Sequence, residues 1–79
     1  MPYLTKIDSA RNERRYYLIA VQATILGQWC VVCVHGRIDR SARPLPPIPC
    51  ADEPAAQQLA ERIEQRKHRR GYVEAEHGE

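Results

Sequence analysis

One long β-type segment, Gln28 to Arg40, constrains the fold most. It reads QWCVVCVHGRIDR, and side chains on a strand alternate between two faces. One face is uniformly apolar and comprises Cys30, Val32, Val34 and Ile38. The other starts apolar and ends in a cationic tip, and comprises Trp29, Val31, Cys33, His35 and Arg37. We therefore expect a central strand whose first face is the core and whose second face offers an imidazole beside a guanidinium to an anion.

Shorter segments on either side of this strand predict its neighbours. Tyr3 to Asp8 alternates as a short first strand, and Arg14 to Gln22 is a second strand rich in aromatic and β-branched residues. Gly27 is the turn residue of the loop that would join the second strand to the third as an antiparallel hairpin. Residues 41–50 carry four prolines, which lack the ladder N–H, so this stretch is expected at a sheet edge or in an extended polyproline form.

A single helix is predicted after the sheet. Asp52 is a good N-cap, and the helix should run to about Arg69, with Gly71 as a left-handed C-cap residue. Its apolar stripe should lie on the sheet and comprises Ala56, Leu59, Ala60 and Ile63. The fold class is therefore α+β, a small antiparallel sheet of about four strands with one C-terminal helix in the order β-β-β-β-α. We expect one domain over residues 1–79, with a core from about 4 to 72 and a flexible acidic tail at 73–79.

Composition limits the class of protein. A chain of 79 residues has room for one modest core, and its hydrophobic content of 43% is ordinary for a globular domain. The apolar runs are too short to cross a bilayer, so no membrane association is expected. Three cysteines without a visible export signal indicate free thiols and a cytoplasmic protein.

The net charge of +2 hides an asymmetry. Residues 1–50 carry seven basic and three acidic side chains, whereas residues 51–79 carry five basic and seven acidic ones. Ten of the twelve basic residues are arginine, whose forked guanidinium suits phosphate. The sheet half of the chain therefore favours an anionic partner.

No catalytic or metal site is predicted. Cys30 and Cys33 spell C-x-x-C, but three residues apart on a strand their thiols point to opposite faces, which favours packed thiols over a zinc site that would add His35 and Cys50. The chain has no nucleophile motif and no glycine-rich phosphate loop. We expect a protein that is not an enzyme and uses no cofactor, metal or small-molecule substrate.

Basic residues gather in three clusters. Those in 66–70 would lie in the last helical turn, where cations complement the helix dipole whatever the protein does. Those in 11–15 lie at the turn before the second strand. The cluster formed by Arg37, Arg40 and Arg43 crowds the end of the central strand with only Asp39 to offset it, so phosphate binding and simple solvation remain equally open there.

The segment Val34-His35-Gly36-Arg37-Ile38 resembles the signature of the WGR domain, in which a tryptophan, a glycine and an arginine end a strand. Further landmarks follow in the family's order: Leu4-Thr5-Lys6-Ile7-Asp8, Asn12, Arg15-Tyr16-Tyr17, Trp29 and Arg69-Arg70-Gly71-Tyr72. The resemblance covers roughly Leu4 to Tyr72. Here His35 stands at the tryptophan position and Asp39 at that of the next glycine.

This resemblance implies a small antiparallel sheet with one packed helix and a role in binding DNA breaks. In such domains of poly(ADP-ribose) polymerases the tryptophan packs on a sugar near the DNA end and the arginine contacts the backbone. Transferred to this chain, it implies sequence-independent binding of duplex DNA near ends or nicks through His35, Arg37, Arg40, Arg43 and Arg15. The alternative is a protein-interaction or self-association module, a homodimer included, that uses the sheet edge and the proline-rich segment 44–49.

Overall fold

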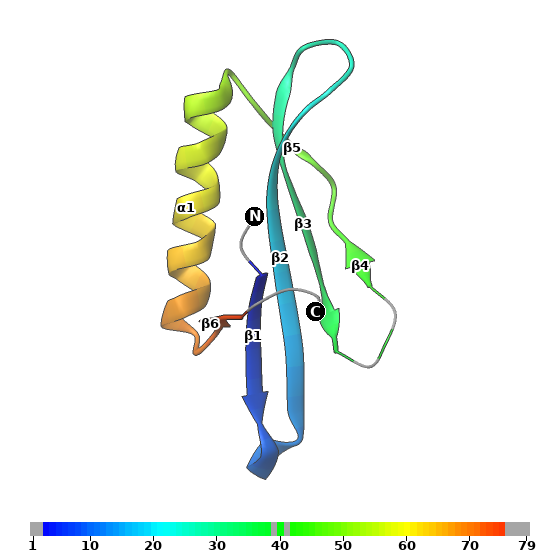
Figure 1. Ribbon diagram of the computed structural model, residues 1–79, viewed down its shortest axis with the longest axis vertical. Coiled ribbons are helices and arrows are strands. Elements are labelled where there is room, and N and C mark those ends of the chain that lie inside the picture. The colour runs from blue at the N-terminus through cyan, green and yellow to red at the C-terminus, as the bar shows by residue number, and fades with distance from the viewer. Residues whose placement is uncertain (1–2, 39, 41, 76–79) are drawn as a thin grey trace.

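The computed structural model describes residues 3–38, 40 and 42–75, and shows a narrow twisted sheet with one helix along it (Figure 1). The elements in chain order are β1 (Tyr3–Asp8), the 3-10 turn η1 (Ser9–Arg11), β2 (Glu13–Ala23), β3 (Trp29–Arg37), β4 (Arg43–Pro44), β5 (Ile48–Cys50), α1 (Glu53–Arg69) and β6 (Val73–Glu74). All strand pairs are antiparallel, in the order β4-β3-β2-β1-β6, with β5 pairing β3 beside β4. The α+β class is thus confirmed.

The proline-rich segment forms the edge of the sheet, as expected, but as two short strands. Arg43 and Pro44 pair with His35 and Val34, and Ile48 to Cys50 pair with Val31 to Trp29. The four prolines between residues 44 and 49 interrupt the donors of this edge, since none of them has an N–H to offer. The fourth expected strand is therefore divided into β4 and β5.

The end of the chain departs from the prediction of a flexible acidic tail at 73–79. Val73 and Glu74 form β6 and pair with Thr5 and Leu4, and the Ala75 amide donates to the Tyr3 carbonyl at 2.8 Å. A strand of two residues is too short to give a recognisable alternation of apolar and polar side chains in the sequence. It forms here because β1 offers an edge with which β6 can pair. Residues 76–79 lie outside the described part of the chain.

The turns and helix ends follow local sequence chemistry. Asn12 adopts a left-handed conformation with φ 55° where η1 joins β2, and Gly27 does the same with φ 81° in the β2–β3 loop. Asp52 caps α1, its Oδ1 accepting from the Ala55 amide at 2.9 Å, with Pro54 in the first turn. Beyond α1, Gly71 has φ 99° and reverses the chain toward the sheet.

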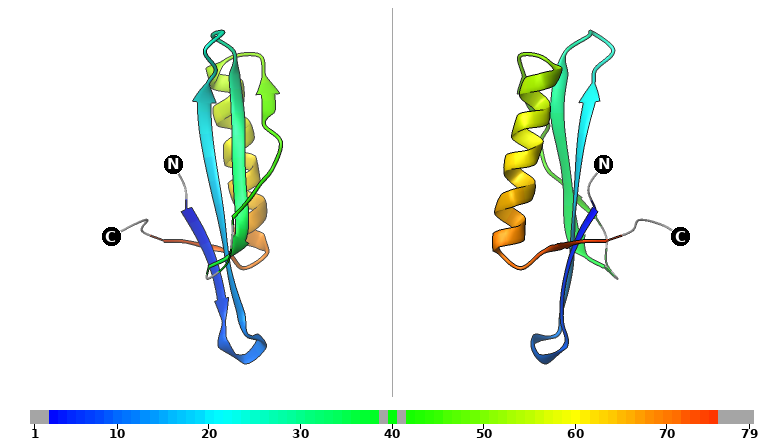
Figure 2. Two further views of the ribbon diagram at one scale, coloured as in Figure 1. Left: turned by 90° about the vertical axis from the view of Figure 1, so that its right-hand side faces the viewer. Right: turned by 60° about the vertical axis from the view of Figure 1, so that its left-hand side comes forward.

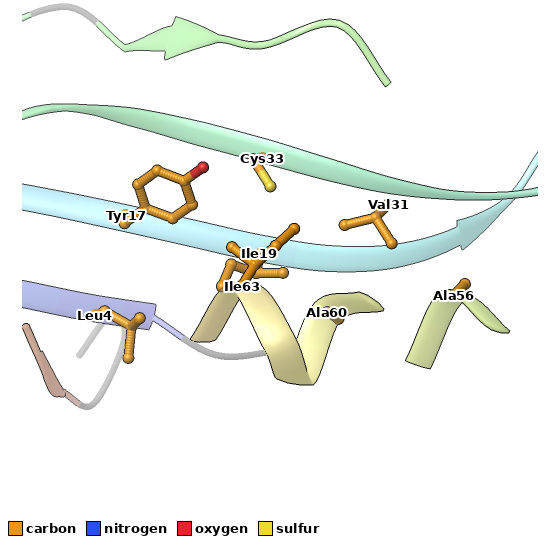
Figure 3. Close-up of a cluster of buried hydrophobic side chains, with 8 residues drawn as sticks. All are labelled: Leu4, Tyr17, Ile19, Val31, Cys33, Ala56, Ala60 and Ile63. Carbon is orange, nitrogen blue, oxygen red and sulfur yellow. The ribbon is translucent and has the colours of Figure 1, made fainter. Parts of the chain in front are cut away.

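The core lies between α1 and one face of the sheet (Figure 3). Eight buried residues from four elements form it: Leu4, Tyr17, Ile19, Val31, Cys33, Ala56, Ala60 and Ile63. Leu59 packs against this cluster, so the predicted helical stripe of apolar residues is confirmed.

The prediction of which β3 face forms the core is wrong. Val31 and Cys33, on the face that ends in His35 and Arg37, are 0% and 3% exposed under the helix. Cys30 is also buried, at 7% exposure, but it lies on the opposite face, where Val32 and Val34 are half-buried. Because β3 is apolar on both faces from residue 30 to 34, alternation alone does not select the face that receives the single helix.

Within the described residues, no helix has the length and apolarity needed to cross a membrane.

Candidate functional site

Strand register places cations in a row across the sheet below the C-terminal end of α1. Arg15 pairs with Lys6 on one side and with Arg37 on the other, so three cations from β1, β2 and β3 are direct neighbours. Like charges directly opposite each other across a sheet cost stability. An anion bound beside this row would offset the electrostatic repulsion between the three cations.

The next row carries the imidazole. Tyr17 pairs with His35, and His35 pairs with Arg43 on the edge strand β4. Paired residues point to the same side of a sheet, so Arg43, His35, Arg15 and Arg37 all project from the face on which α1 lies. Since α1 ends at Arg69, this part of the face continues beyond the helix.

An open hollow of about 600 Å³ is formed here, which we call the arginine hollow. It is lined by Arg15, Tyr16, His35, Gly36, Arg37, Arg40, Ala42, Arg43 and Tyr72. All five residues singled out from the sequence, His35, Arg37, Arg40, Arg43 and Arg15, border this one hollow. They come from β2, β3, β4 and the turn after β3.

Arg37 borders the arginine hollow, and hydrogen bonds hold it against the sheet. Its Nη2 donates to the Asn12 carbonyl at 3.3 Å, next to the left-handed turn that starts β2. The Ile38 amide donates to the Arg14 carbonyl at 2.8 Å, and the Arg40 amide donates to the Arg37 carbonyl at 3.1 Å. These bonds bring the chain after β3 back toward the hollow and keep Arg40 near Arg37. Asp39, expected to offset the arginines, lies outside the described residues.

The His35 ring stacks on the Tyr17 ring. The two ring centroids are 6.0 Å apart with an interplanar angle of 17°. Within the described part of the chain, no hydrogen bond involves the His35 ring. Tyr17 is 8% exposed, and its burial, followed by the neighbouring Cys33 thiol, raises the pKa of Tyr17 to about 12. Tyr17 is therefore a core side chain, and its ring also packs against that of His35.

A second, smaller hollow of about 320 Å³ adjoins the first, and we call it the aromatic hollow. Lys6, Arg15, Tyr17, His35, Leu45, Lys67, Arg70 and Tyr72 line it. Arg15, His35 and Tyr72 border both hollows, which makes the two one continuous surface.

Lys67 occupies the wall of the aromatic hollow. Its Nζ lies 4.3 Å from the centroid of the Tyr17 ring and 5.8 Å from that of Tyr72, which are favourable positions for a cation over aromatic faces. Burial, followed by the charges of Arg70 and Arg66, lowers the pKa of Lys67. The site therefore holds a partly buried cation among other cations.

Sequence reasoning missed Lys67, Lys6 and Tyr72 as neighbours of this site. The helix dipole accounts for cations at residues 66–70, at the end of the helix, but it does not indicate that Lys67 and Arg70 face the aromatic hollow. The useful signal was Tyr72 directly after the left-handed Gly71, since such a turn returns the next side chain to the sheet. Tyr72 indeed meets Tyr17 edge-on at 6.4 Å between centroids.

A short network holds the helix end that carries Tyr72. His68 Nδ1 lies 2.9 Å from the Tyr72 carbonyl oxygen and donates to it, and His68 Nε2 lies 3.5 Å from Glu64 Oε2. The Tyr72 amide donates to the Lys67 carbonyl at 3.1 Å. A side chain at Gly71 would approach Lys6 Cε to 3.4 Å as well as demand a strained φ. Glycine therefore lets the helix end lie against β1.

Among the residues that the structure describes, an acidic side chain lies at one corner of this surface. Glu13 Oε1 is buried without a hydrogen bond and lies 4.0 Å from Lys6 Nζ. Arg15 forms no ion pair with any residue that the structure describes. The surface is thus cationic in net charge, with aromatic rings at its base.

The geometry of the C-x-x-C motif agrees with its prediction. Cys30 and Cys33 point to opposite faces of β3 and cannot share a metal ion, and the three cysteines are free thiols. Among the residues that the structure describes, no three His, Cys, Asp or Glu side chains are grouped as metal ligands.

A small α+β domain with an open cationic surface over aromatic rings defines a binding module. The sequence matches the WGR domain family over residues 1–79, and the chain belongs to this family, which confirms the resemblance seen in its motifs. WGR domains are generally nucleic-acid-binding modules of PARP-like proteins, and the family is a binding family, not a catalytic one. No curated protein and no solved structure gives a significant match to the chain.

Proposed function

We propose that this protein binds duplex DNA near ends or nicks, without sequence preference, through phosphate contacts made by Arg15, Arg37, Arg40 and Arg43, with His35 packing beside them. The observation that carries the proposal is that these five side chains, from four separate segments, border one open hollow. Family membership supports a nucleic-acid partner in general.

The chemistry of the hollow fits a phosphate backbone better than a base edge. Guanidinium groups make forked contacts with phosphate oxygens, and such contacts position a protein on DNA without reading its sequence. The hollow is open, which suits a nucleic-acid strand better than an enclosed small molecule. The aromatic rings of His35 and Tyr72 at its border offer surfaces for a sugar or a terminal base.

The row of Lys6, Arg15 and Arg37 adds an energetic argument. Three neighbouring cations repel one another in the free protein, and a phosphodiester between them exchanges repulsion for attraction. Binding of an anion thus offsets part of the electrostatic repulsion that these neighbouring cations cause in the free protein. We place this activity in the cytoplasm, since three free thiols suit a reducing compartment.

The salt dependence of binding tests the proposal. For phosphate contacts, log affinity should fall linearly with log salt, with a slope of about 0.9 per neutralised phosphate. Arg43→Gln should reduce this slope by about one contact and lower affinity for all duplex sequences equally. Arg62→Gln, on the exposed side of α1, removes the same charge away from the hollow and should leave the slope unchanged. Equal slopes for the two variants would contradict the proposal.

The proline-rich edge supports a second candidate function, recognition of a protein partner. Leu45 and Ile48 are 38% and 41% exposed at the sheet edge, where residues 45–47 separate β4 from β5. An interface of apolar contacts persists when salt is raised, whereas phosphate binding weakens steeply. A partner retained at high salt and lost in Ile48→Asp would favour this alternative.

A further inference from the structure

The turn after α1 returns the chain to the sheet through a few local contacts. Gly71 has φ 99°, its amide donates to the His68 carbonyl at 3.0 Å, and the Tyr72 amide donates to the Lys67 carbonyl at 3.1 Å. Figure 2 (right) shows the chain crossing from the end of α1 to the sheet, where β6 pairs with β1. Tyr72 borders both hollows. The conformation of this turn therefore sets one wall of the cationic surface.

The His68 ring bridges the turn and the helix. Its Nδ1 lies 2.9 Å from the Tyr72 carbonyl oxygen, and its Nε2 lies 3.5 Å from Glu64 Oε2, one helical turn earlier in α1. A carbonyl and an ionised carboxylate can only accept hydrogen bonds. We call this arrangement of His68, Glu64 and the Tyr72 carbonyl the His68 clamp.

The two contacts of the clamp together require a proton on each ring nitrogen. The neutral imidazole carries a single N–H, so donation from Nδ1 to the Tyr72 carbonyl leaves a lone pair on Nε2 that faces the Glu64 carboxylate. Two acceptors then oppose each other. The imidazolium carries an N–H on both nitrogens and a positive charge, so it satisfies both contacts at once. The clamp is therefore complete only when His68 is protonated.

The charged groups near the clamp act in both directions. They are Glu64, Lys67 and Arg69 of α1, Lys6 of β1, which lies against Gly71, and Glu74 of β6. The cations oppose a charge on His68, whereas the carboxylates favour it. Within the part of the chain that the structure describes, the ionic contact of the His68 ring is with Glu64. The His68 and Glu64 side chains are 40% and 24% exposed, so water screens their attraction and the effect should be a few-fold.

We propose that protonation of His68 closes the clamp and so fixes Tyr72 and β6 against the sheet, which makes this wall of the cationic surface better ordered in mildly acid than in mildly alkaline solution. Loss of the proton removes the attraction to Glu64, and the turn then opens more often. Opening releases β6, since two residues form its whole pairing with β1. Weaker binding of duplex DNA by the open state is a consequence that rests on the proposed function.

Hydrogen exchange of the Ala75 amide tests the clamp without any nucleic acid. This amide donates to the Tyr3 carbonyl at 2.8 Å and becomes free to exchange when β6 leaves the sheet. NMR measures its protection factor, in which the intrinsic pH dependence of exchange is removed. In the wild type we expect the protection factor to fall by about two- to five-fold from mildly acid to mildly alkaline solution, as for loss of a partly exposed ion pair.

Glu64→Gln separates the contact from the proton. The glutamine amide can donate to Nε2 of the neutral ring, so the protection factor should stay constant over the same pH range. Glu61→Gln removes the same charge from an exposed position of α1 and should keep the wild-type pH dependence. A wild-type protection factor that does not change with pH would overturn the proposal, as would a Glu64→Gln variant with the pH dependence of the wild type.

Duplex binding gives a second readout. His68 and Glu64 line neither hollow, so Glu64→Gln should still bind duplex, and its affinity relative to that of Glu61→Gln should be higher in mildly alkaline than in mildly acid solution. A constant ratio of these affinities would refute control of the cationic surface by the clamp. Failure of every variant and of the wild type to bind duplex would refute the proposed function, and the exchange of Ala75 would still decide whether the clamp exists.

Discussion

Arg15 and Arg37 lie directly opposite each other on β2 and β3, and Lys6 continues the same row on β1. Like charges opposite each other across a sheet lower the stability of the free protein, and an anion bound on the row would offset that cost.

Removing one of these charges should therefore stabilise the free protein. Arg15→Gln should raise the free energy of unfolding by about 0.2–1 kcal/mol at low salt, the usual range for a cross-strand pair. The gain should shrink as salt screens the repulsion. Thermal unfolding of wild type and variant across a salt series measures this. If Arg15→Gln is less stable than wild type at low salt, Arg15 serves packing and the row carries no strain.

The ring at position 35 should set the strength of binding. His35 stacks on Tyr17, and WGR domains carry a tryptophan at the corresponding position. Base or sugar stacking is worth roughly 1–3 kcal/mol, so His35→Trp should tighten binding to a duplex with open ends by about tenfold or more. Fluorescence anisotropy measures the change.

Protonation of His35 should also strengthen binding. When protonated, the imidazole beside Arg37 adds a positive charge for phosphate. Affinity of the wild type should therefore rise as the solution is changed from mildly alkaline to mildly acid, whereas that of His35→Gln should rise less. An equal pH dependence of both proteins would assign the effect to other groups.

Tyr17 should ionise only in strongly alkaline solution. Its pKa of about 12 lies above the usual value of 10.0, chiefly because of burial. A raised pKa means that the neutral phenol is favoured by folding, so its contribution to stability is fully present below about pH 10 and is lost as pH rises toward 12. The difference in tyrosinate absorbance between wild type and Tyr17→Phe should have its midpoint near pH 12, or at the alkaline unfolding transition seen by circular dichroism. A midpoint near pH 10 in the folded protein would show that Tyr17 is solvated.

The start of α1 offers a prediction on stability alone. Asp52 Oδ1 accepts from the Ala55 amide, and loss of such a cap costs about 1 kcal/mol. Asp52→Ala should therefore lower the free energy of unfolding by that amount in urea denaturation. Since Asp52 lies far along the helix from Tyr72, duplex affinity should not change. Reduced affinity in a fully folded Asp52→Ala protein would mean that the helix start communicates with the hollow.

Local chemistry explains how much of the fold was predictable. The limits of β1, the Asp52 cap and the left-handed Gly71 each depend on a few adjacent residues, and all three agree with the structure. The sheet face that receives α1 was not predictable, because β3 is apolar on both sides and the choice depends on how the chain crosses after β5. β6 was missed because two residues carry no periodic signal.

The candidate site was predictable in part for the same reason. Arg37, Arg40 and Arg43 are close in sequence, and a strand end brings them together. Lys6 and Lys67 join them only through the register of β1 and the path of α1, which connect residues 61 positions apart. The hollow is therefore a product of tertiary structure, although its arginines are visible in the sequence.

The most direct test of the account compares three labelled probes by fluorescence anisotropy: a duplex with open ends, a closed dumbbell without ends, and a single strand. Each is measured at low and at near-physiological salt with wild type and with Arg37→Ala. The account predicts that wild type prefers the open duplex at both salt concentrations and that Arg37→Ala loses this preference while remaining folded. Binding of all three probes only at low salt, with no difference between wild type and Arg37→Ala, would contradict it.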